Sequence, residues 1–211
     1  LRRHALGVLR MLIEKALPVS LNTLIDAAWE AEKAVPGVTD HREELRQFFQ
    51  DRLRVMLRDA GYTTLEVDAV LALNPEKLDE LPKRLAAVRA FMALPEAEAL
   101  TAANKRIGNI LKKIEGEVPT VVNEALLAED AEKQLFAAIN DVEPKALQHF
   151  AAGEYEQMLA TLAVLRGPVD SFFDNVMVNA EDPALRATRQ ALLKRLYDVM
   201  NKVAEIARLA K

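Results

Sequence analysis

The amino-acid sequence predicts an all-α protein, folded as an antiparallel bundle of roughly eight to ten helices. Apolar residues recur every three or four positions along almost the whole chain, as they do on the buried face of a helix. No alternation of apolar and polar residues, the pattern of a half-buried strand, persists for more than a few positions. Ala, Leu, Glu, Lys and Arg, which favour helices, dominate the composition, and the 211 residues include only seven glycines. Pro, Gly and capping residues interrupt the pattern and so separate the helices.

Two helices are predicted in the first 38 residues. The first occupies 1–17 and ends at Pro18, which cannot continue a helix. Ser20 can cap the second with its hydroxyl, and the segment VPGVTD at 35–40 ends it. Because the chain begins inside a helical pattern and without an initiator Met, we expect it to be part of a longer protein. We expect residues 1–38 to form the end of a preceding helical domain or linker helices.

A long helix is predicted next, over about 40–60. Asp40 is suited to be its N-cap, and Gly61 stands just beyond its C-terminus, where a left-handed conformation is common. Thr63 or Thr64 then opens another helix. Such residues satisfy the backbone amide and carbonyl groups that helix ends leave unpaired, so they indicate where each helix begins and ends.

Prolines mark the helices in the middle of the chain. Segments 82–94 and 95–114 are predicted helices, each with a proline in its first turn, where the missing amide costs no hydrogen bond. The polar segment EGEVPTV at 115–121 follows them. We expect it to be a connection to the helices of the last third of the chain.

Three helical regions are predicted in that last third. The first covers 130–153 and ends at a glycine. The second, 154–178, must break or kink at the Gly-Pro pair that contains Pro168, because proline removes an amide donor and clashes with the preceding turn. Asp182 and Pro183 are suited to open the final helix, one as N-cap and the other as first helical residue.

The sequence contains no recognisable catalytic centre, cofactor site or metal site. There is no cysteine, so disulfides and thiolate metal sites are excluded. The three histidines lie far apart without metal-ligand spacing, the two serines stand outside Gly-flanked turns, and no glycine-rich phosphate loop is present. No apolar window approaches the length of a membrane span. We therefore expect no catalytic residue and no bound metal.

This acidic chain carries one strongly cationic stretch. The net charge of −4 gives no support to nucleic-acid binding through overall positive charge, so a polyanion would need cations gathered locally. The stretch LTAANKRIGNILKK at 100–113 contains four cations and no acid. Residues seven positions apart lie on nearly the same face of a helix, so Lys105 shares a face with Lys112, and Arg106 shares one with Lys113. No acid three or four positions away inside the stretch neutralises them.

Amides and two further arginines extend this candidate site. Asn104 and Asn109 interleave with the cations, and Arg186 and Arg189, three residues apart on the final helix, can face one phosphate. The predicted polyanion-binding residues are Asn104, Lys105, Arg106, Asn109, Lys112, Lys113, Arg186 and Arg189. Two plainer alternatives stay open. Such a run is often a solvated helix face or a partner for acids on a neighbouring helix, and Asn104 can instead mark a cap or turn.

Four blocks of the sequence resemble a known family. They are ALTAANKRIGNIL, FFQDRLRVMLRDAGY, DAVLALNP and VDSFFDNVMVNAEDPALRATRQALLKRL. Together, and with the spacing between them, they resemble the C-terminal region of the β subunit of bacterial tetrameric glycyl-tRNA synthetase. The last block is similar more widely to the helical anticodon-binding domain of arginyl-tRNA synthetases, whereas the first points to the glycyl β subunit. The resemblance covers nearly the whole chain.

The resemblance implies a function for the cationic stretch. It implies that 39–211 form a helical anticodon-binding domain that binds the anticodon arm of glycine tRNA in the cytoplasm. The eight residues named above would then be tRNA-binding. ATP-dependent attachment of glycine is implied for the whole synthetase, with ATP at the α subunit, so we expect no cofactor in this chain. The implied partners are glycine tRNA and the α subunit of a tetramer, with neither a membrane nor DNA.

A second hypothesis comes from another class of protein. The chain would be a helical scaffold for subunit assembly without direct contact to RNA. Its cationic face would then dock an acidic patch of a partner chain. The two hypotheses differ in whether glycine tRNA is bound at low salt and released as salt rises.

Overall fold

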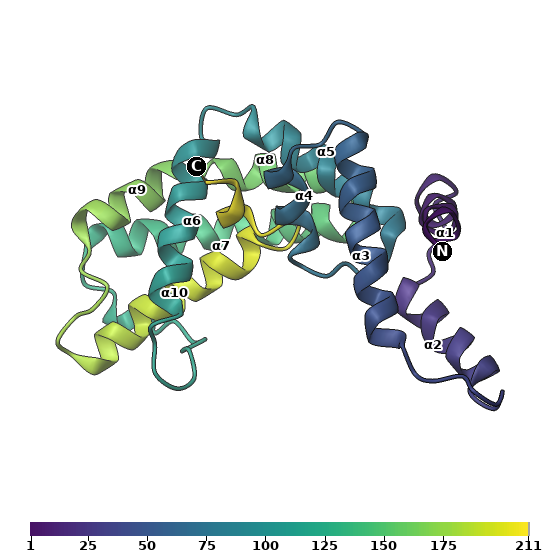
Figure 1. The fold of residues 1–211 in the computed structure, drawn as a ribbon. Helices are drawn as coiled ribbons and strands as arrows, with labels where there is room; N and C mark the ends of the chain where they lie inside the picture. Colours follow the sequence, from purple (N-terminus) through teal and green to yellow (C-terminus); the bar gives the residue numbers. More distant parts are fainter. Residues whose placement is uncertain (211) are drawn as a thin grey trace. The chain divides into compact units, whose positions relative to one another are not determined.

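The structure is a computed structural model that describes residues 1–210. Within this part of the chain there are ten α-helices and three short 3₁₀ helices, and the single β-bridge, between Ser20 and Lys77, is isolated. Figure 1 shows the course of the helices. The all-α prediction is confirmed. The chain divides by packing into two compact units, Leu1–Leu85 and Ala86–Lys211, with the division inside one helix, α5. The predicted domain boundary after residue 38 is not tested by this division and stays a prediction.

The first unit is built around α3. Its helices are α1 (Arg2–Glu14), α2 (Leu21–Glu32), α3 (Arg42–Asp59), α4 (Thr64–Leu71), the 3₁₀ helix η1 (Leu78–Glu80) and the start of α5 (Leu81–Met92). Helices α1, α2 and α4 each pack against α3, and α1 also packs against η1. Leu9 and Leu12 of α1 and Phe49 and Leu53 of α3 are among the buried side chains of this unit.

Capping residues define the helices of the first unit as the sequence predicts. The Ser20 hydroxyl accepts a hydrogen bond from the Thr23 amide at 3.4 Å. Thr63 forms a capping box with Glu66 at the start of α4, and Gly61 has φ +92°, a conformation that favours glycine. One cap differs from the prediction. The N-cap of α3 is His41 and not Asp40.

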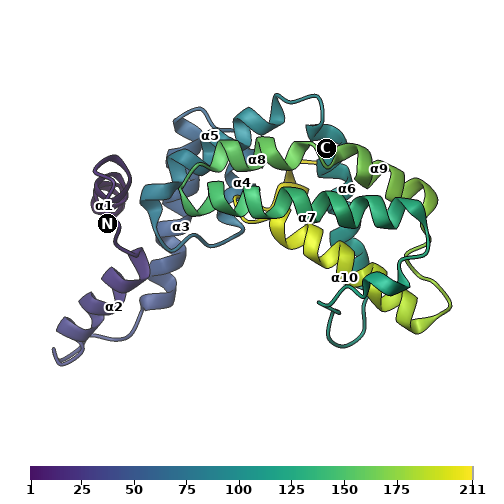
Figure 2. The same ribbon diagram turned by 180° about the vertical axis from the view of Figure 1, so that it is seen from behind.

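The second unit surrounds α7. After the rest of α5 it contains α6 (Ala97–Leu111), η2 (Glu124–Leu126), α7 (Asp130–Ala151), α8 (Tyr155–Ala163), α9 (Arg166–Asn175), α10 (Pro183–Met200) and η3 (Ile206–Leu209). Helices α8 and α9 run end to end along α7, and α10 packs against α7 as well (Figure 2). Helix α6 packs against α9, α10 and η3. Phe172, Leu135, Ile139 and Leu192 lie fully in this core.

The predicted breaks in the second unit are confirmed, with small shifts. Helix α8 ends at Ala163 and α9 begins at Arg166, so Pro168 lies in the first turn of α9, where its missing amide is tolerated. Asp182 caps α10 and Pro183 is its first residue. Helix α6 is shorter than the predicted 95–114, since it ends at Leu111, and α10 ends at Met200.

Candidate nucleic-acid interface

The C-terminal half of α6 carries an exposed cationic face. Lys105, Arg106 and Asn109 are exposed, whereas Leu100 and Ile107 on the opposite side are buried. This division follows from the helical period, since residues three, four and seven apart share a face. Lys112 and Lys113, which follow the last turn of α6, are exposed as well. Five of the eight predicted residues therefore lie on the surface at α6.

An aromatic ring supports the cationic face. The guanidinium carbon of Arg106 lies 4.2 Å from the centroid of the Phe173 ring, which belongs to α9 and is half-buried. A guanidinium over an aromatic face gains a cation–π attraction and keeps its N–H groups available in the plane of the group. Phe173 thus orients Arg106 without neutralising its charge.

The face borders a surface hollow of about 500 Å³. Side chains of α6, of the α9–α10 connection and of α10 line it. They are Ala102, Lys105, Arg106, Asn109, Ile110, Lys113, Ile114, Asn179 and Gln190. Three of these residues are cations, three bear amides and none is an acid. The hollow therefore combines positive charge with groups that both donate and accept hydrogen bonds.

The cations of this face are not neutralised by the protein. Within residues 1–210, no carboxylate lies within 4.0 Å of Lys105, Arg106, Lys112 or Lys113, whereas many other cations in the second unit have such a partner. On α7, for example, Lys145 donates to its own neighbour, Asp141, at 2.7 Å. The plainer alternative, in which neighbouring helices supply acids to the stretch, does not apply to these four residues in the described part of the chain.

The prediction was wrong for Asn104, which is buried with an exposed fraction of 0%. Its Oδ1 accepts a hydrogen bond from Nδ2 of Asn201 at 3.0 Å, and Oδ1 of Asn201 accepts one from the Ile206 amide at 2.9 Å. Asn104 lies on the buried stripe of α6, four residues after Leu100 and three before Ile107. That spacing was a signal for burial. Asn104 ties α6 to the end of α10 and is not available to a base.

The prediction was also wrong for Arg189, whose exposed fraction is 5%. Its Nε pairs with the carboxylate of Glu132, which is fully buried, and its Nη1 donates to the Met177 carbonyl at 2.7 Å. Arg189 stands three residues before the buried Leu192 and so shares the buried stripe of α10. Breaking a buried pair by removing one partner costs about 3–5 kcal/mol, so this guanidinium is not available to a phosphate.

Arg186 occupies an intermediate position. It is half-buried, and its Nη1 donates to the Ala180 carbonyl at 3.1 Å. It does not line the hollow. Helix α10 packs beside α6, but Gln190 rather than an arginine lines the hollow from α10. Neither Gln190 nor Asn179 was predicted, because an isolated amide has no distinguishing pattern in a single sequence.

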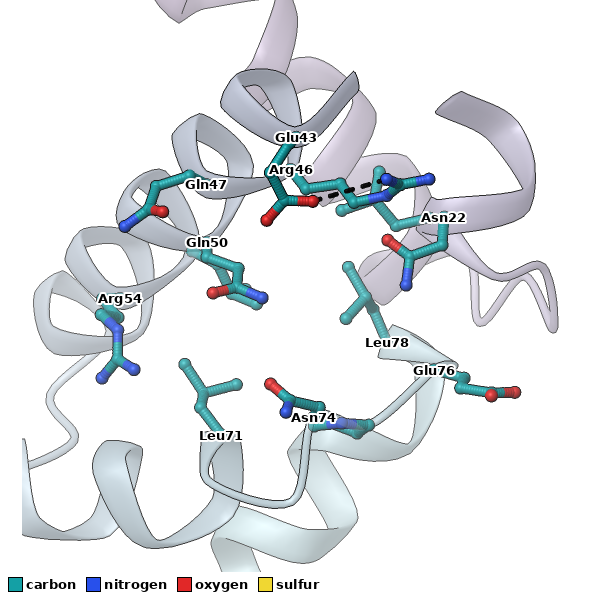
Figure 3. Close-up of a pocket in the computed structure, with 13 residues that line it drawn as sticks. Asn22, Glu43, Arg46, Gln47, Gln50, Arg54, Leu71, Asn74, Glu76 and Leu78 are labelled. Carbon is teal, nitrogen blue, oxygen red and sulfur yellow. Dashed lines mark ion pairs between the residues drawn. The ribbon is translucent and has the colours of Figure 1, made fainter. Parts of the chain in front are cut away.

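A second hollow, in the first unit, has a different charge balance. It measures about 320 Å³ and lies between α2, α3 and the segment after α4 (Figure 3). Its amide side chains are Asn22, Gln47, Gln50 and Asn74. Arg46 pairs with Glu43 at 3.6 Å and with Asp26 at 2.6 Å, and Arg54 pairs with Asp68. Because acids neutralise both arginines, this hollow is a weaker candidate for a polyanion.

Among 1–210, no group of three or more His, Asp or Glu side chains is arranged to hold a metal ion. No helix in that part of the chain combines the length and apolarity needed to cross a membrane.

Comparison with known proteins agrees with the resemblance read from the sequence. Residues 100–207 match the family model of the DALR anticodon binding domain, and residues 1–72 match that of the glycyl-tRNA synthetase beta subunit. Glycine–tRNA ligase beta subunits of Leptothrix cholodnii and Delftia acidovorans are 60% and 55% identical over 210 residues, 100% of this chain. That of Thiobacillus denitrificans is 54% identical over 211 residues. The chain spans 29% to 30% of the length of these relatives.

The DALR match covers α6, α7, α8, α9 and α10, the helices that build and support the cationic hollow. The two family matches and the similarity over the whole chain confirm the family recognised from the four sequence blocks. The chain therefore belongs to the DALR anticodon binding domain family and is homologous to the β subunit of glycine–tRNA ligase.

Proposed function

We propose that this chain is the tRNA-binding module of a glycyl-tRNA synthetase β subunit, and that the hollow beside α6 contacts the anticodon arm of glycine tRNA. The observation that carries this proposal is the hollow itself. It gathers Lys105, Arg106 and Lys113 with three amide side chains and no acid, in a protein whose net charge is −4. Local charge of this kind is what a phosphate backbone requires when overall charge is unfavourable.

The chemistry of the hollow suits an RNA loop. Cations neutralise phosphates and position the RNA, while specificity comes from contacts to base edges and faces. RNA loops expose unstacked bases whose edges amides can read. Asn109, Asn179 and Gln190 supply such amides, and Arg106, which lies over the Phe173 ring, can meet a phosphate with two N–H groups.

We further propose a division of labour within the synthetase. The resemblance to the glycyl-tRNA synthetase β subunit implies that glycine activation with ATP takes place at the α subunit, and the lack of a recognisable catalytic constellation in this sequence agrees with that division. This chain would hold no cofactor. The partners would be glycine tRNA and the α subunit, in the cytoplasm. ATP–pyrophosphate exchange catalysed by this chain alone would contradict the division.

The experiment that tests the tRNA site compares two charge-matched variants of the full-length protein that carries this chain. Lys105→Ala with Arg106→Ala removes two cations of the hollow. Lys133→Ala with Lys145→Ala removes two exposed cations of α7. Dissociation constants for glycine tRNA are measured between low and high salt.

The hollow variant is expected to bind every RNA more weakly by a similar factor. Its salt slope should be flatter by about one unit or less for each phosphate that the variant no longer neutralises. The α7 variant is expected to keep both values. If the hollow variant keeps its affinity and salt slope but no longer associates with the α subunit, the scaffold hypothesis is the better one.

A further inference from the structure

The connection between α9 and α10 alternates between buried and exposed side chains. In segment 176–180, Val176, Val178 and Ala180 are buried, whereas Met177 and Asn179 are exposed. Met177 is 73% exposed, although its side chain is apolar. The buried residues anchor the segment to the core, and the two exposed ones face solvent.

Two arginines hold the backbone of this segment. Arg189 donates to the Met177 carbonyl at 2.7 Å, and Arg186 donates to the Ala180 carbonyl at 3.1 Å. Arg189 is itself held by Glu132, which also accepts from the amides of residues 128 and 129 at 2.8 Å each. The segment is therefore fixed near both ends by side chains of α10, and one of these is part of a buried ion pair.

The segment borders the cationic hollow. Asn179 is one of the residues that line it. Met177 stands two residues earlier, and two residues of chain span at most about 7 Å. A nucleotide whose phosphate binds the cations of α6 could therefore place its base against Met177 or Asn179.

The two side chains differ in what they offer a base. The thioether of Met is polarizable and makes favourable contacts with aromatic rings, which include the face of a base. The amide of Asn both donates and accepts, as the edge of a base does. Bases of RNA loops that are recognised by proteins are typically unstacked, so that face and edge are both open.

We propose that segment 176–180 is the base-contacting edge of the tRNA site. Met177 packs on the face of one unstacked base of the anticodon loop, and Asn179 bonds to the edge of that base or its neighbour. Arg186 and Arg189 are positioning residues, which hold the segment beside the phosphate-binding cations. This inference rests on the proposed function and adds to it the residues that would discriminate between sequences.

The test pairs protein variants with altered tRNA. The full-length protein and its Met177→Ala, Asn179→Ala and Met92→Ala variants bind glycine tRNA and a set of transcripts, each with one anticodon-loop base replaced by an abasic site. Met92, at the end of α5, is a partly exposed methionine outside segment 176–180 and the hollow, so its variant is the matched control.

Met177→Ala and Asn179→Ala are each expected to weaken binding of intact tRNA, for Asn179→Ala by about 5- to 140-fold if the substitution removes a bidentate hydrogen bond to a base. Each should keep the wild-type salt slope. For each variant there should also be one abasic transcript that it binds as tightly as it binds intact tRNA. The substitution has already removed the contact to that base, so loss of the base costs no further affinity. Met92→Ala should match wild type throughout.

The role of the arginines has its own readout. Arg186 is only half-buried, so Arg186→Ala is expected to fold, and circular dichroism checks that it does. In the Arg186→Ala background, the effect of Met177→Ala should depend less on whether the contacted anticodon-loop base is present, which means that the coupling between Met177 and that base is reduced. The salt slope should stay unchanged. Arg186→Lys, which keeps a donor for the Ala180 carbonyl, should restore part of the coupling.

The outcomes separate this inference from the proposed function. If the Lys105 and Arg106 double variant weakens binding but neither Met177→Ala nor Asn179→Ala couples to any abasic position, the segment does not read bases and the inference fails alone. If none of these variants changes tRNA binding, the proposed site itself is wrong.

Discussion

The guanidinium of Arg106 lies over the ring of Phe173, with 4.2 Å between the guanidinium carbon and the ring centroid. The two residues come from α6 and α9, so the contact joins the cationic face to a neighbouring helix. It keeps the guanidinium at the edge of the hollow, where no described carboxylate competes for it.

Phe173→Leu is expected to lower the affinity for glycine tRNA about 2- to 5-fold, because an exposed cation–π contact contributes roughly 0.5–1 kcal/mol to the orientation of the arginine. Binding titrations at fixed salt measure it. In an Arg106→Ala background the same substitution should have no further effect. An equal loss of affinity in both backgrounds would mean that Phe173 acts by another route.

Asn104→Ala is expected to lower the free energy of unfolding by about 0.5–1.5 kcal/mol, because it removes one of the two acceptors of Asn201 Nδ2, whose other acceptor is the Tyr197 carbonyl. Urea denaturation followed by circular dichroism measures this. The folded variant should discriminate between anticodons as wild type does. Asn109→Ala, an exposed neighbour on the same helix, should keep its stability within about 0.5 kcal/mol and bind tRNA more weakly. The reverse pattern would restore Asn104 as a base-reading residue.

Gly108 lies where α6 approaches α10 closely. A Cβ atom at this position would lie 3.2 Å from Cε2 of Tyr197, tighter than ordinary contact, whereas one at Gly7, inside α1, meets no neighbour within 4 Å. Gly7→Ala is expected to raise the free energy of unfolding by about 0.5–1 kcal/mol through helix propensity. The free energy of unfolding of Gly108→Ala should be at least about 1 kcal/mol lower than that of the other variant, because Tyr197 must move. Equal stabilities in thermal or urea denaturation would show that Tyr197 yields freely.

Arg189→Met is expected to destabilise the second unit by about 3–5 kcal/mol, because it leaves the Glu132 carboxylate buried without its cation. Adding Glu132→Gln should recover part of this stability, since the neutral amide oxygen can still accept from the amides that precede it. Lys194→Met, which breaks an exposed pair with Asp198, should change stability by no more than about 1 kcal/mol. Additive effects in the double variant would contradict direct coupling of the buried pair.

The stability of the first unit is expected to depend on pH through the Asp40 carboxyl. Hydrogen bonds from Arg42 lower the pKa of the Asp40 carboxyl from its ordinary 3.8 to about 2. A lowered pKa in the folded state stabilises the protein above the ordinary value, and this stabilisation is lost as the pH falls from about 4 through 2. Asp40→Asn should therefore lose less stability over that range than wild type in acid titrations of unfolding. Identical acid profiles would contradict the assignment.

Much of the fold was determined by local features of the sequence. Ser20, Thr63 and Asp182 cap the helices that they were expected to cap, and Pro168 separates α8 from α9. These predictions succeeded because caps and prolines act on backbone groups within a few residues. The exposed cations of α6 were predictable for the same reason. The helical period alone places Lys105 and Arg106 away from the face of α6 on which Ile107 is buried.

Only the tertiary structure decided which polar residues belong to the core. Asn104 and Asn109 look alike in the sequence, yet the first is buried because Asn201, 97 residues later, supplies a hydrogen bond. Arg189 is buried because Glu132, 57 residues earlier, supplies its counter-charge. A polar group enters a core only when a partner offsets the loss of water, and that partner comes from a distant part of the chain. The sequence shows that such residues lie on a buried stripe, but the partner becomes visible only when α6, α7 and α10 pack together.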